Sequence, residues 1–227
     1  MKMRYIRNRS EQQQGGKQNM KKKYELLTLM QLAMLIAIQL VMKAIGLGSV
    51  PVGPLYMSFL TLPIAVGAIL IGPAAGAVLG GVFGAVSFYD AITGGSVMTS
   101  ALFQVSPVNT FVLCVVTRVL MGFCTGLVYK AVKKIDRSHT WSYFVGSISA
   151  PLLNTLFFMG YIVLVFYNTD FVQGLVASKG ASNPLMFVIL LVGVQGVIEA
   201  AACGILGAVI CKALAVVLRN QTKSVGA

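Results

Sequence analysis

No charged side chain interrupts the sequence between Lys43 and Asp90, and most of that stretch is apolar. Over the whole chain of 227 residues, 57% are hydrophobic and only 11% are charged. Soluble domains carry about 25% charged residues, so this composition excludes an ordinary soluble fold. A helix needs about 20 apolar residues to cross the hydrocarbon layer of a membrane. The sequence therefore predicts an all-α integral membrane protein.

Within this uncharged stretch, two Gly-Pro pairs, at 53–54 and 72–73, bracket a short apolar segment. Because Gly-Pro pairs mark turns, we expect the segment to be a short helix. The helix that follows carries a glycine at every fourth position of one face: Gly76, Gly80 and Gly84. Small residues at this spacing let helix backbones approach closely in a membrane. This face is therefore expected to make a close helix contact.

Six apolar segments predict a bundle of six membrane-spanning helices, at about 24–45, 59–71, 74–92, 107–130, 141–167 and 184–217. The polar segment 93–106 is expected to be an outer loop, and a short helix at the membrane surface is expected near 171–177. Basic clusters precede the first segment and follow the fourth and the sixth. Positive charge is enriched in cytoplasmic loops, so the N and C termini are both expected to be cytoplasmic.

Three regions follow from this pattern. Residues 1–20 are polar and basic, lack the apolar core of a signal peptide, and are expected to be a disordered extension. Residues 21–218 make up the predicted six-helix domain, and residues 219–227 a cytoplasmic tail. The net charge of +12 lies mostly in the termini and one loop. That distribution is typical of a membrane protein, so nucleic acid is not an expected partner.

Several kinds of chemistry have no motif in this chain. Its four cysteines lie in apolar runs and it has a single histidine, so neither a metal site nor a disulfide framework is expected. No phosphate-binding loop, zinc-protease motif or nucleophile elbow occurs. We therefore expect no catalytic residue, no cofactor and no ATP hydrolysis by this chain, which is not expected to be an enzyme.

Two charged side chains are predicted near the middle of the membrane, Arg118 in the fourth helix and Glu199 in the sixth. Charges at this depth are costly, and they are usually paired or functional. One interpretation is an ion pair that holds the two helices together. The other is that Arg118 binds the carboxylate of a ligand, because a forked guanidinium matches that shape.

Uncharged polar groups also lie deep in the predicted spans. Asn154 is near Pro151, which lacks an N–H and leaves the carbonyl of Ser147 without its usual partner. Such a kink suits a ligand pocket, although hydrogen bonds between helices are the alternative. Together with side chains near the outer ends of the helices, the candidate substrate-binding residues are Asn109, Arg118, Asn154, Gln195, Tyr56, Tyr161 and Asp90.

Five short motifs occur in order along the chain. They are Ala33-x-x-x-Ala37, Val-Pro-Val-Gly-Pro at 50–54, Ala-Ile-Leu-Ile-Gly-Pro-Ala-Ala-Gly at 68–76, Arg-Val-Leu-Met-Gly at 118–122 and Asn-Thr-Leu at 154–156. In these motifs, and in its six predicted spans, the sequence resembles the substrate-binding (S) component of energy-coupling factor (ECF) vitamin transporters of bacteria. The resemblance covers about residues 24–217.

This resemblance implies a multi-pass protein of the bacterial plasma membrane that captures a vitamin from outside. Its implied partners are a transmembrane coupling (T) subunit, which docks at Ala33 and Ala37, and two cytoplasmic ATPase subunits. The motifs look most similar to the pantothenate-type subgroup. Folate, riboflavin or a thiamin precursor are alternative ligands, and a non-transport membrane assembly protein is the alternative class. We further expect residues 50–58 to cover the pocket and the glycine face to lie beside the docking region.

Overall fold

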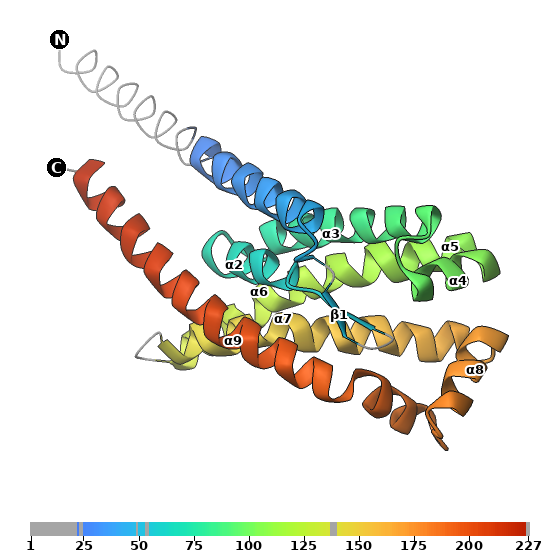
Figure 1. Ribbon diagram of the computed structural model, residues 1–227. Helices are drawn as coiled ribbons and strands as arrows, with labels where there is room; N and C mark the ends of the chain where they lie inside the picture. The colour runs from blue at the N-terminus through green and yellow to red at the C-terminus, as the bar shows by residue number, and fades with distance from the viewer. Residues whose placement is uncertain (1–21, 23–24, 49, 53–54, 137–139, 226–227) are drawn as a thin grey trace, which may run out of the picture.

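The computed structural model describes residues 22, 25–48, 50–52, 55–136 and 140–225, and it is helical apart from one short hairpin (Figure 1). The first helix, Glu25–Ala44, is followed by strands β1 (Val50–Val52) and β2 (Leu55–Met57), which pair antiparallel. The later helices are α2 (Thr61–Leu70), α3 (Pro73–Thr93), α4 (Val97–Val105), α5 (Pro107–Phe111), α6 (Thr117–Ile135), α7 (Thr140–Tyr161), α8 (Asp170–Ser178) and α9 (Pro184–Val225). Two π-helical turns, η1 (Val112–Val116) and η2 (Ile162–Phe166), join α5 to α6 and extend α7.

The described helices include five that are long and apolar enough to cross a membrane: Glu25–Ala44, Pro73–Thr93, Pro107–Ile135, Thr140–Phe166 and Gln195–Val217. The segment predicted as the second span is the ten-residue helix α2. At about 15 Å, it covers only half the hydrocarbon thickness. Ile64 and Ala65 are fully buried because α2 packs among α3, α6, α7 and α9. An apolar helix of this kind belongs in an interior, so α2 is a central core helix.

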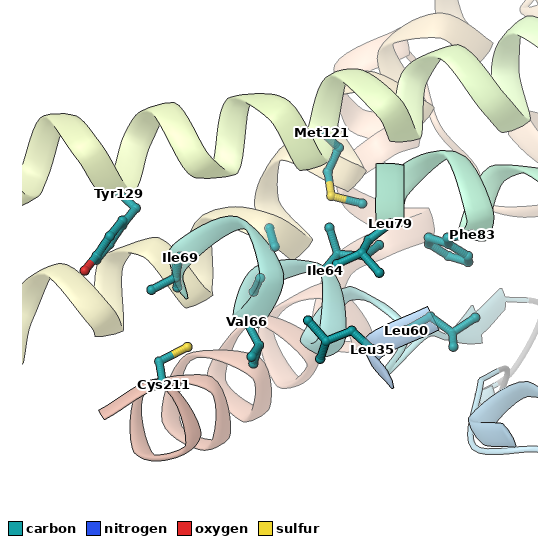
Figure 2. Close-up of a cluster of buried hydrophobic side chains, with 12 residues drawn as sticks. Leu35, Leu60, Ile64, Val66, Ile69, Leu79, Phe83, Met121, Tyr129 and Cys211 are labelled. Atoms are coloured by element: carbon teal, nitrogen blue, oxygen red, sulfur yellow. The ribbon is translucent and has the colours of Figure 1, made fainter. Parts of the chain in front are cut away.

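The first helix is attached to the bundle along a narrow line. Leu35 and Gln39 are its buried side chains within the described residues. Figure 2 shows Leu35 in the apolar cluster around α2, together with Leu60 and Ile64. Most of the remaining surface of this helix, which is rich in leucine and methionine, is exposed. Such a surface is suited to contact with lipid or with another membrane protein.

The glycine face of α3 packs against α6. A Cβ atom on Gly84 would lie 2.7 Å from the carbonyl oxygen of Cys114. On Gly76 or Gly80 it would overlap the carbonyl oxygen of Gly122 or Arg118, respectively. The predicted close helix contact is thus made within the chain. Residues of η1 and α6 cover the three glycines, and the expectation that this face lies beside a partner's docking region stays a prediction.

The segment 93–106, which was predicted to be a loop, contains α4. Among the polar and small residues of this segment, Met98 and Leu102 form an apolar pair at helical spacing. Both side chains are buried. They join a second apolar cluster with Phe166 of η2 and Val172 of α8. Figure 1 places α4 and α8 at the end of the bundle opposite the end of α9. The short helix expected near 171–177 is present as α8.

Helix α9 is broken at Gly193, where the backbone turns to φ 27° and ψ −124°. The break divides it into Pro184–Gly193 and a longer apolar part, Gln195–Val217. A positive φ is accessible to glycine because it has no Cβ. The sequence predicts one continuous helix here, because a single glycine in an apolar run is compatible with a helix.

Candidate ligand-binding site

A cavity with a volume of about 130 Å³ lies among the first helix, α3, α4, α6, α7 and α9. Of the predicted binding residues, Asp90, Arg118, Asn154 and Gln195 line it, and Glu199 lines it as well. These side chains come from four helices that are distant in the sequence. The structure therefore brings together both deep charges and two of the three deep amides.

Two aromatic rings lie close to the guanidinium group of Arg118. Its guanidinium carbon lies 4.4 Å from the ring centroid of Phe83 and 4.7 Å from that of Phe158. Both rings lie close enough to attract the cation electrostatically. Nη1 donates a hydrogen bond of 3.0 Å to the carbonyl oxygen of Cys114. Nε is buried and has no hydrogen-bond partner among the described residues. Arg118 therefore keeps one buried donor, Nε, that the described residues leave unsatisfied.

No ion pair joins Arg118 to Glu199 in the described part of the chain. Only 6% of the Arg118 surface and 9% of the Glu199 surface are exposed. Each charge lines the same cavity without neutralising the other directly. Because a buried charge without a partner is costly, this arrangement favours a ligand that contacts one or both.

The π-helical turn η1 sets the position of Arg118. At its end, the backbone N–H of Thr117 bonds to the carbonyl of Val112, five residues back. The Thr117 hydroxyl donates to the carbonyl of Leu113, and Arg118 donates to that of Cys114. Two side chains therefore bind carbonyls of the widened turn. Single π-helical turns inside α-helices are frequent at functional sites.

Glu199 is fixed from the other side of the cavity by Thr61, the first residue of α2. The Thr61 hydroxyl lies 3.5 Å from Oε1 of Glu199 and 3.2 Å from the sulfur of Cys203. Both contacts link α2 to α9. A carboxylate has about four acceptor sites, so Glu199 retains capacity to accept hydrogen bonds from a ligand.

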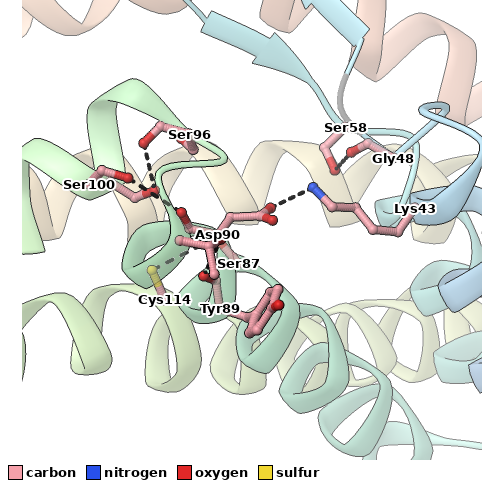
Figure 3. Close-up of polar contacts among 11 residues, drawn as sticks. Lys43, Gly48, Ser58, Ser87, Tyr89, Asp90, Ser96, Ser100 and Cys114 are labelled. Atoms are coloured by element: carbon pink, nitrogen blue, oxygen red, sulfur yellow. Dashed lines mark hydrogen bonds and ion pairs between the residues drawn. The ribbon is translucent and has the colours of Figure 1, made fainter.

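An ion pair closes one side of the cavity (Figure 3). Nζ of Lys43, in the first helix, lies 2.5 Å from Oδ2 of Asp90 in α3. The backbone carbonyl of Asp90 also accepts hydrogen bonds from the Gly95 amide and the Ser100 hydroxyl. Asp90 is therefore engaged by the protein and ties the first helix and α4 to α3.

Of the three other predicted residues, Asn109 and Tyr161 lie outside the lining of this cavity. The Tyr161 hydroxyl donates a hydrogen bond of 3.4 Å to Oδ1 of Asn109, which joins α7 to α5. The backbone N–H of Asn109 donates to the hydroxyl of Ser106, the residue that caps α5. Tyr56 lies in β2 opposite Pro51, and its side chain is outside the described part of the structure.

Sequence reasoning missed Lys43 and the two phenylalanines, although helical spacing contains part of the signal. Phe83 and Ser87 precede Asp90 by seven and three residues, on one face of α3, and all three line the cavity. Phe158 follows Asn154 by one helical turn, and both line the cavity. A search for aromatic residues at these offsets from the polar candidates would have found both rings.

The described residues contain no group of three or more His, Cys, Asp and Glu side chains that could hold a metal ion. Cys114, Cys203 and Cys211 are buried free thiols, and Cys124 is half-buried. The side chains that line the cavity can bind a polar ligand. They include one guanidinium group, one buried carboxylate, two amides and several hydroxyl groups.

Comparison with known proteins adds two findings. Residues 27–211 match the family model described as "ECF transporter, substrate-specific component". Among solved structures, ThiT from Listeria monocytogenes is similar, with a TM-score of 0.57 and 17% sequence identity. That match covers 83% of this chain and 95% of the ThiT chain, and at this identity it shows the fold alone. No curated protein matches the sequence.

Proposed function

The chain belongs to the family of substrate-specific components of ECF transporters, and on that premise we propose that it captures a small acidic vitamin, with pantothenate as the leading candidate. The family consists of transport subunits rather than enzymes. The observation that carries the proposal is the buried Nε of Arg118, a residue that lines the cavity beside two aromatic rings, because the described residues give this donor no hydrogen-bond partner. A guanidinium edge binds a planar carboxylate through two parallel hydrogen bonds.

The rest of the cavity suits the other groups of pantothenate. This vitamin has a carboxylate at one end, an amide in the middle and hydroxyls at the other end. With its carboxylate at Arg118, its amide would reach the side-chain amides of Asn154 and Gln195. Its hydroxyls would donate to Glu199. All four residues line one cavity, so a single bound molecule can satisfy them together.

A second candidate is a ligand that presents hydrogen-bond donors to a carboxylate, such as a thiamin precursor. The observation that favours it is Glu199, a buried carboxylate that lines the cavity without forming an ion pair in the described part of the chain. In that case Glu199 would accept hydrogen bonds from the ligand, and Arg118 would remain bound to Cys114 and the two rings. The two candidates predict opposite consequences for substitutions at Arg118 and Glu199. Folate and riboflavin remain alternatives with flat rings.

We also propose the membrane orientation and the partners. The basic residues Lys133 and Lys134 end α6, at the end of the bundle where α9 also ends (Figure 1). Positive charge favours the cytoplasm for this end, so the cavity would face outward. Ala33 and Ala37 are exposed on the first helix. They offer a small-residue surface to a T subunit, which would recruit two ATPase subunits in the bacterial plasma membrane.

Mass spectrometry of small molecules released from the purified protein tests the proposed ligand. The protein is purified from cells supplied with all candidate vitamins, washed and denatured. We expect pantothenate in amounts close to those of the protein. Release of a thiamin precursor would favour the second candidate, and release of folate or riboflavin would contradict both. Equilibrium dialysis against the released compound then verifies that binding is saturable.

A further inference from the structure

A second hollow lies between α7 and the broken helix α9, with a volume of about 780 Å³. We name it the lateral groove. Every lining side chain that the structure describes is apolar except Thr155. The groove therefore offers almost no hydrogen-bond partner to water, and water is stable in a cavity only with about two to four polar partners.

The lateral groove faces away from the core of the bundle. Leu156, Ile189 and Val197 line it and remain 64%, 67% and 69% exposed, respectively. Its walls belong largely to Thr140–Phe166 and Gln195–Val217, which are both long and apolar enough to cross a membrane. At that depth, the medium in contact with these side chains is lipid hydrocarbon rather than water.

The lateral groove adjoins the ligand cavity. Thr155, Met159, Val192 and Gly196 line both hollows, so they form one wall between them. The break at Gly193 lies beside this wall and on the groove. Irregular backbone at membrane depth is tolerated where it lines a cavity or is buried in protein. A molecule bound in the lateral groove would therefore contact the residues that separate the groove from the ligand cavity.

We propose that the lateral groove is a binding site for one acyl chain of a membrane phospholipid. An acyl chain matches the groove in polarity and is the hydrocarbon available at that depth. It would fill space that otherwise leaves lining atoms without van der Waals contacts. The headgroup makes no contribution to the site, since the lining offers no charged side chain. The proposal holds for any ligand in the adjoining cavity.

Photolabelling in a bilayer tests the site. The full chain is placed in phosphatidylcholine nanodiscs that contain a trace of phosphatidylcholine with a diazirine in one acyl chain. After irradiation, labelled residues are located by mass spectrometry. We expect labels concentrated on the groove faces of α7 and α9, well above those on the exposed leucines and methionines of the first helix. Equal labelling of both surfaces would mean ordinary surrounding lipid and would overturn the proposal.

Substitutions that add side-chain atoms to the lateral groove provide a second test of the acyl-chain site. Gly160 lines the groove, and a Cβ atom added there would meet no atom within 4 Å, so Gly160→Leu is a suitable variant for adding a side chain to the groove. Ala201→Leu, on the opposite wall, is a second variant. Both should reduce groove labelling several-fold. Gly174→Leu on α8 is the matched control, because its Cβ is equally unhindered and it lies outside both hollows.

Vitamin binding by the same variants separates this site from the proposed function. Both groove variants should bind the vitamin as the native chain does. Unchanged lipid labelling in Gly160→Leu and Ala201→Leu would overturn the acyl-chain site and leave the vitamin proposal intact. Loss of vitamin binding without loss of labelling would assign the groove to the cargo and likewise overturn the proposal.

Discussion

Gly80 of α3 and Arg118 of α6 meet backbone to backbone, so closely that a Cβ atom at position 80 would overlap the carbonyl oxygen of Arg118. Gly84 makes a similar approach to Cys114, whose carbonyl accepts the hydrogen bond from the Arg118 guanidinium. The glycine face of α3 therefore sets both the depth and the rotation of the helix that carries the buried cation. Ligand binding by Arg118 is expected to depend on glycines that touch no ligand.

Gly80→Ala should lower stability because the added methyl meets a backbone atom that cannot move aside. Overpacking of this kind costs about 1–3 kcal/mol, and thermal unfolding in detergent measures it. Gly81→Ala is the matched control on the next residue, since its Cβ would lie 3.5 Å from Val119, an ordinary contact. We expect the control to be neutral or slightly more stable. Equal effects of both substitutions would contradict the close packing described for Gly80.

The Lys43–Asp90 ion pair should contribute a measurable coupling energy, because both side chains are mostly buried, with 27% and 17% exposed. A double-mutant cycle with Lys43→Met and Asp90→Asn isolates this coupling from the other contacts of each residue. We expect the two changes to be non-additive by about 0.5–2 kcal/mol in the free energy of unfolding. Strict additivity would show that the pair does not tie the first helix to α3.

The exposed alanines of the first helix should be required for assembly and dispensable for ligand binding. Ala33→Trp and Ala37→Trp each place a large side chain on a surface that is exposed in the chain alone. We expect co-purification with the ATPase subunits to be lost while vitamin binding stays at the native level. Ala177→Trp on the exposed surface of α8 is the control and should assemble normally. Normal assembly of all three variants would contradict the proposal that Ala33 and Ala37 are docking residues.

Much of the helical framework could be predicted from the sequence, because long uncharged apolar runs allow few other structures in a membrane. Helix α4 was missed since Met98 and Leu102 stand among polar residues that resemble a loop. The break at Gly193 was missed for a different reason, since the same glycine is compatible with a continuous helix. For α4, tertiary packing of Met98 and Leu102, rather than local sequence preference, determines the structure.

The candidate site was predictable in its charges but not in their surroundings. Arg118 and Glu199 stand out because few charged residues interrupt the apolar runs. Whether they pair depends on helix rotation, which η1 and the contact with Gly80 determine and which periodicity cannot specify. The same rotation brings Phe83 and Phe158 over the guanidinium and leaves its Nε without a partner in the described structure.

Isothermal titration of pantothenate and of its primary amide tests whether Arg118 binds a ligand carboxylate. The amide keeps the shape of the vitamin and removes its charge. We expect the native chain to lose about 2–3 kcal/mol, or roughly 30- to 150-fold in affinity, between acid and amide. Arg118→Gln should bind the acid as weakly as the native chain binds the amide, and Arg118→Lys should not restore binding fully because lysine lacks the fork.

Gln195→Ala is the control in the same cavity and should weaken binding far less than Arg118→Gln. Thermal unfolding of each variant verifies that it is folded before titration. We expect the native chain to bind the acid much more tightly than the amide, and we expect this difference in affinity to disappear in Arg118→Gln. Equal binding of acid and amide by the native chain, or an equally small loss in the variants of Arg118 and Gln195, would contradict this expectation.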